Sequence, residues 1–337
     1  MTPAPRAIAL VKLSALGDVV HATPVVEALA DAFPAARLTW IVERRAAALL
    51  QDHPRLSDVV TIDTRAWRRV RTPSAARTLA RALGELRGRL RAARFDVALD
   101  LQGLVKSGIV TAATGAPVRI GFAAGYRRER LNGLFTNRHV SPPRSARHVV
   151  DQYLALLEPL GVTAQRVVFR LPARAAAESR VEEFFTDAGL KPHGRLVVLN
   201  PGAGKPAKRW PVERFAELAG RLAGEANARV LVLWGPGEQT AARAIAEAPG
   251  TVLAPPTDLD TLVAIVRRAS IVVAADTGPL HVAAAVGVSC VGLYGPTSAA
   301  RNGPYGAGHH TLSATDGRMT SIEVGAVLTA VRELLGP

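Results

Sequence analysis

The chain has 337 residues, of which 48% are hydrophobic, so it can bury cores in two domains and is not globally disordered. Its one cysteine, Cys290, excludes an internal disulfide and lies in an apolar run that predicts inert burial in a strand. The net charge is +14, with 26 Lys and Arg against 13 Asp and Glu in residues 1–170, but 16 against 15 in residues 171–337. We therefore expect an anionic partner for the first half.

Two further absences bear on location. No apolar run reaches the roughly 18 residues of a membrane span. The first ten residues lead directly into a predicted strand and lack the layout of a signal peptide. We expect a soluble, cytoplasmic protein.

Short β-branched runs alternate with helical stretches, which is the pattern of βα units on a parallel sheet. The strands expected in the first half are Ala7–Leu13, Leu38–Val42, Val59–Asp63, Val97–Leu101 and Val118–Ile120. Those expected in the second half are Leu196–Asn200, Val230–Trp234, Ile271–Ala275 and Ser289–Leu293, with helices at Pro24–Phe33, Ala75–Ala93, Val212–Gly224 and Leu259–Arg268. The prediction is an α/β chain of two Rossmann-like, doubly wound domains that face an interdomain cleft, with ligand sites at the carboxyl ends of both sheets.

The domain junction is predicted between Gly161 and Arg195, where a clear strand is missing and a helix fits at Ala175–Ala188. This gives an N-terminal domain over residues 1–165, a linker over 166–194 and a C-terminal domain over 195–320. Residues 321–337 contain a last amphipathic helix that could pack back on the N-terminal domain.

The first strand leads into Lys12-Leu-Ser-Ala-Leu-Gly-Asp-Val-Val-His21. Gly17 permits a tight turn, so Asp18 lies at a helix start. Either the carboxylate of Asp18 caps that helix, or it faces the cleft and removes a proton from a hydroxyl. Both interpretations stand on the sequence.

A glycine-rich basic loop, Pro201-Gly-Ala-Gly-Lys-Pro-Ala-Lys-Arg-Trp-Pro211, follows the first strand of the second half. Gly202 and Gly204 let backbone N–H groups approach an anion, and Lys208 is one of three cationic side chains beside them. The loop is neither a Walker A nor a GxGxxG motif. It predicts a phosphate site, with a solvated basic turn as the alternative.

Another glycine-containing loop follows strand Ile271–Ala275, with the sequence Asp276-Thr-Gly-Pro-Leu-His281. Its first residues suit a helix cap, Gly278 permits close backbone approach, and the N–H groups of a helix start favour a pyrophosphate. His281 lies one turn further along and either faces the same anion or is simply packed.

Two other strand ends of the second half have similar chemistry. Glu238 follows a strand at about the spacing of a ribose-binding carboxylate, although a helix N-terminus also favours an acid there. Tyr294-Gly-Pro-Thr297 follows the last predicted strand. Four strand ends with glycine and polar residues predict a ligand site at this edge.

The first half contains a basic stretch from Arg65 to Arg94, with ten arginines and one acid, Glu85. Leucines recur at helical spacing in its second part, as in a surface helix that packs on the sheet. The arginines, with Trp67, could meet phosphate groups at a membrane surface.

Together these motifs resemble glycosyltransferase family 9, the heptosyltransferases of lipopolysaccharide core assembly. The matching segments occur in the family's order along nearly the whole chain: Lys12–His21, Asp100–Ser107, Arg119–Phe122, Pro201–Pro211 and Asp276–Thr297. The resemblance implies a GT-B fold, an ADP-heptose donor held by the second domain and an anionic, lipid-linked saccharide acceptor held by the first.

The resemblance also implies roles for individual residues. The family's catalytic aspartate falls on Asp18. The expected donor-binding residues are Lys208, Glu238, Asp276, Thr277, Gly278 and His281, with Gly202 and Gly204. The expected acceptor-binding residues are Arg65, Arg68, Arg69, Arg71, Lys106 and Arg119. As a departure, Ala203 and Gly204 stand where the family often has hydroxyl residues, which puts the donor contacts of that loop in doubt.

Asp258-Leu-Asp260 matches the DxD pattern of metal-dependent glycosyltransferases, but it opens a predicted helix, where acidic capping explains it. We therefore expect no metal, with cationic side chains and helix N-termini stabilising the leaving diphosphate. No cofactor is expected either, because ADP-heptose is a substrate.

The implied reaction is an inverting transfer of heptose from ADP-heptose to a lipid A/Kdo-type inner-core acceptor. The implied location is peripheral, at the inner face of the cytoplasmic membrane. The alternative enzyme is a GT-B transferase that uses a UDP- or GDP-sugar on a different lipid or glycan. A nucleic-acid partner is not expected, because aromatic residues make up only 5% of the chain and no basic–aromatic recognition segment is present.

Overall fold

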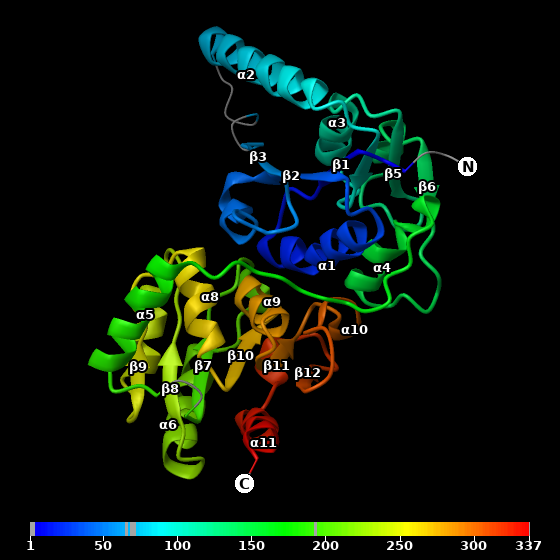
Figure 1. Cartoon of the computed structure of the whole chain (residues 1–337). Helices are drawn as coiled ribbons and strands as arrows, with labels where there is room; N and C mark the ends of the chain where they lie inside the picture. Colours follow the sequence, from blue (N-terminus) through cyan, green and yellow to red (C-terminus); the bar gives the residue numbers. More distant parts are fainter. Residues whose placement is uncertain (1–3, 65–66, 68–71, 192–193, 337) are drawn as a thin grey trace. The chain divides into compact units, whose positions relative to one another are not determined.

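The computed structural model describes residues 4–64, 67, 72–191 and 194–336. The chain divides into two compact units, Met1–Arg170, coloured from blue to green in Figure 1, and Leu171–Pro337, coloured from green to red. None of the described helices is both long and apolar enough to cross a bilayer.

The first unit is built on a six-stranded parallel sheet with the strand order β3-β2-β1-β4-β5-β6. Its strands are β1 (Ala7–Val11), β2 (Arg37–Glu43), β3 (Asp58–Ile62), β4 (Val97–Asp100), β5 (Val118–Phe122) and β6 (Arg138–Val140). Its helices are α1 (Leu16–Ala32), α2 (Pro73–Ala92), α3 (Val105–Ala113) and α4 (Val149–Ala155), with the 3₁₀ helices η1 (Arg44–Leu49), η3 (Arg130–Leu134) and η4 (Glu158–Leu160). Because helices cover both faces of such a sheet, its central strands are continuous apolar runs, and β1 is buried along its whole length.

The second unit repeats this plan, with the strand order β12-β11-β10-β7-β8-β9. Its strands are β7 (Leu196–Asn200), β8 (Arg229–Val232), β9 (Thr251–Leu253), β10 (Ile271–Ala275), β11 (Ser289–Tyr294) and β12 (His309–Ser313). Its helices are α5 (Ala175–Asp187), α6 (Val212–Glu225), α7 (Gln239–Ala246), α8 (Leu259–Arg267), α9 (Gly278–Ala285), α10 (Ala299–Asn302) and α11 (Val324–Leu335), with the 3₁₀ helices η5 (Pro206–Lys208) and η6 (Met319–Ser321).

Both sheets therefore have the Rossmann order 3-2-1-4-5-6 when the strands of each unit are counted along the chain. In each sheet the order reverses beside the first strand, between β1 and β4 in one unit and between β7 and β10 in the other. Loops that leave two strands at such a switch point diverge and open a crevice at the carboxyl ends. Four of the sequence motifs follow these strands, whereas Glu238 and Tyr294–Thr297 follow β8 and β11.

Helix α1 starts at Leu16, as the prediction that Asp18 lies at a helix start requires, and it also includes Pro24, at which the predicted stretch Pro24–Phe33 begins. A proline in a helix leaves the carbonyl four residues before it without its N–H partner. Here the Thr23 hydroxyl donates to the carbonyl of Val20, at 2.8 Å, and satisfies it. The helix therefore continues through the proline and includes Asp18 in its first turn.

The last helix differs from expectation in where it packs. The apolar face of α11 lies in the core of the second unit, where Val327 and Val331 are fully buried with residues of α6 and β10. The expectation that this helix packs back on the N-terminal domain is therefore wrong for its apolar face. Likewise, α5 packs against α8, so most of the predicted linker 166–194 belongs to the second unit.

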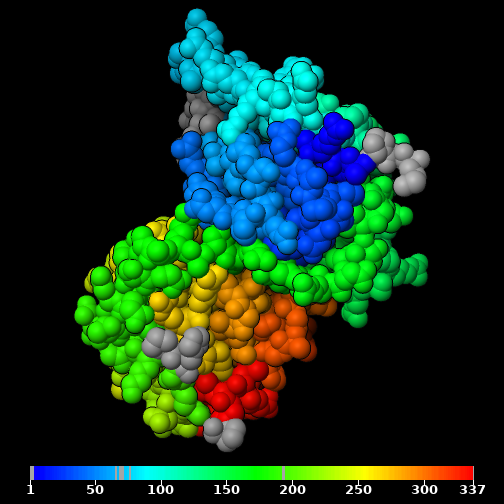
Figure 2. All heavy atoms as spheres, viewed as in Figure 1, coloured from blue at the N-terminus to red at the C-terminus, as the bar shows by residue number. Residues whose placement is uncertain are grey.

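Helix α2 stands out from the rest of the first unit (Figures 1 and 2). Leu90 is buried in a core cluster and Leu86 packs against that cluster, which confirms the predicted packing of the leucines at this end. Leu83, one turn earlier, is 37% exposed.

Candidate active site

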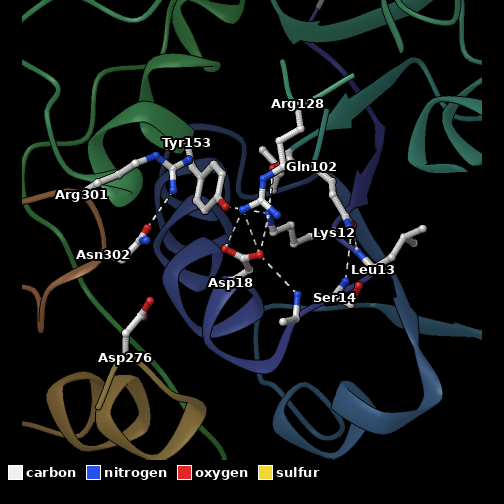
Figure 3. Close-up of polar contacts among 12 residues, drawn as sticks. Lys12, Leu13, Ser14, Asp18, Gln102, Arg128, Tyr153, Asp276, Arg301 and Asn302 are labelled. Atoms are coloured by element: carbon white, nitrogen blue, oxygen red, sulfur yellow. Dashed lines mark hydrogen bonds and ion pairs between the residues drawn. The ribbon is translucent and has the colours of Figure 1, made fainter. Parts of the chain in front are cut away.

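The loops that follow β1 and β4 are tied together at the switch point of the first sheet. The Gln102 side-chain oxygen, just after β4, accepts hydrogen bonds from the backbone N–H groups of Leu13 at 2.7 Å and Ser14 at 3.4 Å (Figure 3). These bonds fix the short loop that connects β1 to α1. They thereby fix the direction in which the first turn of α1 presents Asp18.

The Asp18 carboxylate is both a helix cap and the centre of a cationic site. One of its oxygens accepts a hydrogen bond from Ala15 N at 3.3 Å, as the capping interpretation predicts. The same oxygen lies 3.3 Å from Arg128 Nη2 and 3.9 Å from Lys12 Nζ (Figure 3). With 15% of its side chain exposed, Asp18 lies at the carboxyl edge of the sheet. A carboxylate there can accept a proton from a bound hydroxyl, so capping and base catalysis are compatible.

Lys12 is the buried member of this group, with only 1% of its side chain exposed. Its ammonium donates to the Tyr153 hydroxyl at 2.6 Å and to the Leu101 carbonyl at 3.1 Å, and lies 4.5 Å from the centre of the tyrosine ring. A buried ammonium needs such partners to offset the loss of water. Lys12 is therefore held in place by α4 and by the segment after β4 while its charge remains next to Asp18.

A pocket of about 560 Å³ opens beside the loop that connects β1 to α1. Its lining includes Ser14, Arg45, Trp67 and Lys106. Lys106 Nζ lies 2.7 Å from the Glu43 carboxylate and 3.3 Å from the Ser14 hydroxyl. The structure thus brings Lys106 to the edge where Asp18 lies, and Glu43 balances part of its charge.

At the carboxyl edge of the second sheet, one carboxylate is bound by a lysine and a histidine. Lys208 Nζ lies 2.6 Å from Asp276 Oδ2, and His281 Nε2 lies 3.1 Å from Asp276 Oδ1. Asp276 follows β10, His281 lies in α9, and Lys208 ends η5 in the loop after β7. The structure therefore brings together three of the predicted donor-binding residues.

The same contacts set the ionisation of Asp276. Burial by itself raises the pKa of this carboxyl, but the hydrogen bonds from His281 and Lys208 outweigh it and hold the pKa well below its usual range. Asp276 is therefore ionised at neutral pH. It fixes the ammonium of Lys208 and leaves two N–H donors of that group for an anion.

Gly202 and Glu238 lie against each other at the same edge of the second sheet. A Cβ atom built on Gly202 would collide with the Glu238 carboxylate, whereas one on Gly204 would meet open space. Glu238 Oε2 also accepts a hydrogen bond from Gly235 N at 2.9 Å. Gly202 thus leaves space for the Glu238 carboxylate, and Gly204 is not crowded; the predicted approach of both glycines to an anion stays a prediction.

Thr277 connects the two loops of this switch point. Its hydroxyl donates to the Ala275 carbonyl at 3.1 Å and lies 3.4 Å from Asn200 Nδ2. Thr277 is the residue before α9, but its side chain makes no capping bond, so the first-turn N–H groups of α9, which begins at Gly278, are not used by it. These N–H groups suit an anionic ligand.

The DxD aspartates have structural partners. Asp258 Oδ1 accepts a hydrogen bond from Thr261 N at 2.7 Å at the start of α8, which confirms the capping interpretation. Asp260 pairs with Arg174 at 2.9 Å. Within the part of the chain that the structure describes, no three His, Cys, Asp or Glu side chains are grouped so as to hold a metal ion.

A family model described as glycosyltransferase family 9 (heptosyltransferase) matches residues 83–329, well over half of the chain. The chain belongs to this family. As a family 9 glycosyltransferase, it is 31% identical to lipopolysaccharide heptosyltransferase 1 of Pseudomonas aeruginosa PAO1, over 89% of this chain and 81% of the relative. It is also 28% identical to the lipopolysaccharide core heptosyltransferase OpsX of Haemophilus influenzae, over 90% of this chain and 83% of the relative.

Solved structures agree on the fold of this family 9 chain. It is similar to the E. coli heptosyltransferase WaaC with ADP-2-deoxy-2-fluoro heptose, with a TM-score of 0.79, 27% identity and coverage of 97% of this chain and 99% of that chain. The predicted α/β class and GT-B fold are confirmed.

Not every predicted acceptor residue of this glycosyltransferase reaches the Asp18 edge. Arg119 is the second residue of β5, so it lies towards the amino end of the sheet, and its guanidinium donates to the carbonyls of Phe135 at 2.8 Å and Ala116 at 2.9 Å. We correct its expected role: Arg119 ties the β5 strand to neighbouring backbone. The other predicted acceptor arginines, Arg65, Arg68, Arg69 and Arg71, lie outside the described residues.

The sequence prediction missed several residues of this family 9 site. Arg128 and Tyr153 reach Asp18 and Lys12 across 110 and 141 positions of the chain, and no local pattern distinguishes them. Arg45 could have been found, because it closely follows the predicted strand Leu38–Val42, as polar site residues do elsewhere in the chain.

Proposed function

We propose that this glycosyltransferase transfers a heptose from ADP-heptose to a lipopolysaccharide inner-core acceptor of the lipid A/Kdo type, with inversion at the anomeric carbon. The heptose donor is supported by the names of the relatives and by the solved WaaC structure with an ADP-heptose analogue, to which the chain is similar over almost its whole length. One observation supports the assignment most directly. In one chain of this family, the carboxyl edge of the first sheet presents the Asp18 carboxylate, and the carboxyl edge of the second presents the Lys208 ammonium and the first turn of α9.

In the proposed mechanism, Asp18 accepts the proton of the acceptor hydroxyl while the hydroxyl oxygen attacks the anomeric carbon. The bond from that carbon to the diphosphate oxygen breaks in the same step, and the ADP leaves with the bonding electrons. Lys12 and Arg128 hold the Asp18 carboxylate in position at 3.9 and 3.3 Å. A single displacement of this kind inverts the anomeric centre, as the proposal requires.

The second unit is proposed to bind the donor. The Lys208 ammonium, fixed by Asp276, and the first-turn N–H groups of α9 stabilise the charge that develops on the leaving diphosphate. Close approach of backbone at Gly202 leaves room for the ligand beside Glu238, whose carboxylate is suited to accept hydrogen bonds from ribose hydroxyls. This chemistry needs neither a metal ion nor a cofactor, so we propose that the enzyme uses neither.

We also propose that the enzyme acts in the cytoplasm, peripherally at the inner face of the cytoplasmic membrane. The donor is a water-soluble nucleotide sugar, whereas the proposed acceptor is anchored by its acyl chains. The first unit, with 26 Lys and Arg against 13 Asp and Glu, has the charge that an anionic acceptor requires.

The test is a transfer assay with ADP-heptose and a panel of lipopolysaccharide cores truncated at successive sugars. Mass spectrometry is expected to show the addition of one heptose to one member of the panel. In parallel, ADP is expected to raise the thermal unfolding midpoint more than UDP or GDP does. A larger shift with UDP or GDP, together with no transfer from ADP-heptose, would favour the alternative nucleotide-sugar transferase.

A further inference from the structure

Among the residues that the structure describes, the exposed large apolar side chains all belong to the first unit. Within the described parts of the chain, they are Leu83, Ile109, Tyr126, Leu131 and Leu134. Single exposed leucines are common on protein surfaces. Here, however, four of the five belong to one stretch of chain, residues 109–134, and the second unit has none among its described residues.

Two of these leucines are presented on a rigid turn. Leu131 and Leu134 are 63% and 77% exposed and stand three residues apart in the 3₁₀ helix η3, where residues at this spacing point in the same direction. Between them, Asn132 is fully buried and donates to the Asp100 carboxylate at 2.6 Å and to the Leu104 carbonyl at 2.8 Å. The inward amide thus anchors η3 while both leucines face outward.

Helix α3 and the turn before η3 belong to the same surface. A Cβ atom on Gly108 would overlap the side chains of Phe135 and Asn132, so α3 packs tightly on η3 next to the exposed Ile109. Glu129 accepts a hydrogen bond from Val105 N at 2.6 Å and ties the turn to the start of α3. We call Ile109, Tyr126, Leu131 and Leu134 the apolar patch.

Arginines border the apolar patch. Arg128 and Arg130 are exposed, and Arg127 lies partly buried against η3. On the neighbouring side, helix α2 has further exposed arginines, and its Arg91 lies against Gly115 at the end of α3. An apolar patch with a cationic border is the pattern of a surface that inserts into anionic lipid headgroups.

We propose that the apolar patch docks on the surface of an anionic phospholipid bilayer, with Leu131 and Leu134 entering the acyl boundary and the bordering arginines binding lipid phosphates. An anionic bilayer is the partner that charge complementarity favours, because the unit that has the patch also has a net charge of +13, against +1 for the second half. The proposal deepens the proposed function and rests on its lipid-linked acceptor. Arg128 belongs to both sites, since it borders the patch and contacts Asp18, so docking here would place a lipid-linked acceptor beside the base.

The test measures vesicle binding by the full chain, without donor or acceptor, so loss of the transfer activity would not affect it. Wild type is expected to cosediment with vesicles of phosphatidylethanolamine and phosphatidylglycerol, and not with phosphatidylcholine vesicles. The variant Leu131→Ser/Leu134→Ser is expected to lose about tenfold or more in partition coefficient, because apolar burial drives insertion. Arg130→Gln is expected to lose about fivefold.

Arg243→Gln is the matched control, since Arg243 is an exposed arginine on α7 of the second unit, and its vesicle binding is expected to equal that of wild type. Both leucines are largely exposed, so the thermal unfolding midpoint of the leucine variant and its turnover of a lipid-free core acceptor are expected to be unchanged. Vesicle binding by the leucine variant that equals wild type would overturn the proposal. So would a wild-type dimer that the leucine variant converts to monomers without change in vesicle binding, because the occupant would then be a second copy.

Discussion

The two units share one strand order, yet the carboxyl edges of their sheets have different chemistry. In the first unit, the first turn of α1, which follows β1, presents a carboxylate with two cations around it. In the second, the loop after β7 contributes glycine and lysine, and the loop after β10 contributes the carboxylate. In both, one amide side chain ties the loops together: Gln102 beside β1 and Asn200 at the end of β7. The same scaffold thus supports two sites because only the loops differ.

The two aspartates at these edges show what the difference means. Asp276 is held by Lys208 at 2.6 Å and by His281 at 3.1 Å, and 9% of its side chain is exposed. Asp18 has longer contacts, of 3.3 Å to Arg128 and 3.9 Å to Lys12. Short, charge-assisted hydrogen bonds immobilise a carboxylate. Asp276 is therefore held firmly between its two neighbours, whereas Asp18 lies at the sheet edge with these longer contacts.

The largest effect is expected for Asp18→Asn, which removes the proposed base but preserves the shape of the side chain. Turnover is expected to fall about 10²–10⁴-fold, the usual contribution of general base catalysis. ADP affinity, measured by calorimetry, is expected to stay within about twofold of wild type, because the donor is proposed to bind the second unit. Asp31→Asn is the control, since Asp31 lies at the far end of the same helix and is 61% exposed. Near-normal turnover of a folded Asp18→Asn protein would remove the distinction between the two aspartates.

Lys208→Ala tests the second edge directly. The substitution removes a cation from the proposed diphosphate site and leaves the Asp276 carboxylate facing the ligand. ADP affinity is expected to fall about 10- to 100-fold, as for a lost hydrogen bond between charged groups. Lys205→Ala in the same loop is the control, because Lys205 is exposed and lies outside the Asp276 network. Equal losses in both variants would mean that the loop binds ADP by general charge, without the pair to Asp276.

The sequence predicts the central part of both sheets well, because their strands are buried on both faces and therefore appear as apolar runs. The strands that it misses are β6, β9 and β12, which lie at sheet edges. Edge strands are short or half-exposed, and their apolar signal is weak. The Gly17–Asp18 motif predicts the start of α1, but the predicted stretch Pro24–Phe33 stops short of it, because the bond from Thr23 that satisfies the Val20 carbonyl has no general sequence signature.

The site is predictable where its residues follow strands, and not where they arrive from distant segments. The positions of Asp18, Lys208 and Asp276 follow from the rule that ligand sites form at the carboxyl ends of parallel strands. Arg119 shows the limit of the same reasoning, because a residue early in a strand lies near the opposite edge of the sheet. The contacts of Lys12 with Tyr153 depend on how α4 packs, which no local pattern encodes.

Asp276→Asn is expected to change stability in a pH-dependent way. The pKa of Asp276 is lower in the folded chain than in the unfolded chain, so its ionised form stabilises the fold above the unfolded value of about 4 and this contribution is lost as the pH falls. Loss of its charge-assisted bonds is expected to cost about 2 kcal/mol at pH 7. The difference from wild type in thermal unfolding of the second unit is expected to shrink below about pH 4. A difference that is constant with pH would show that Asp276 acts by shape rather than by charge.

The smallest effect separates two glycines of one loop. Gly202→Ala forces a methyl group against the Glu238 carboxylate, which can swing away because it ends a flexible side chain, so the free energy of unfolding is expected to fall by less than about 1 kcal/mol while ADP binding weakens as Glu238 shifts. Gly204→Ala meets no atom within 4 Å and is the matched control, with stability and ADP affinity expected to equal wild type. Thermal unfolding and calorimetry of both variants check this. Equal behaviour of the two would mean that Glu238 moves freely, so that the crevice after β7 is no more rigid than the edge around Asp18.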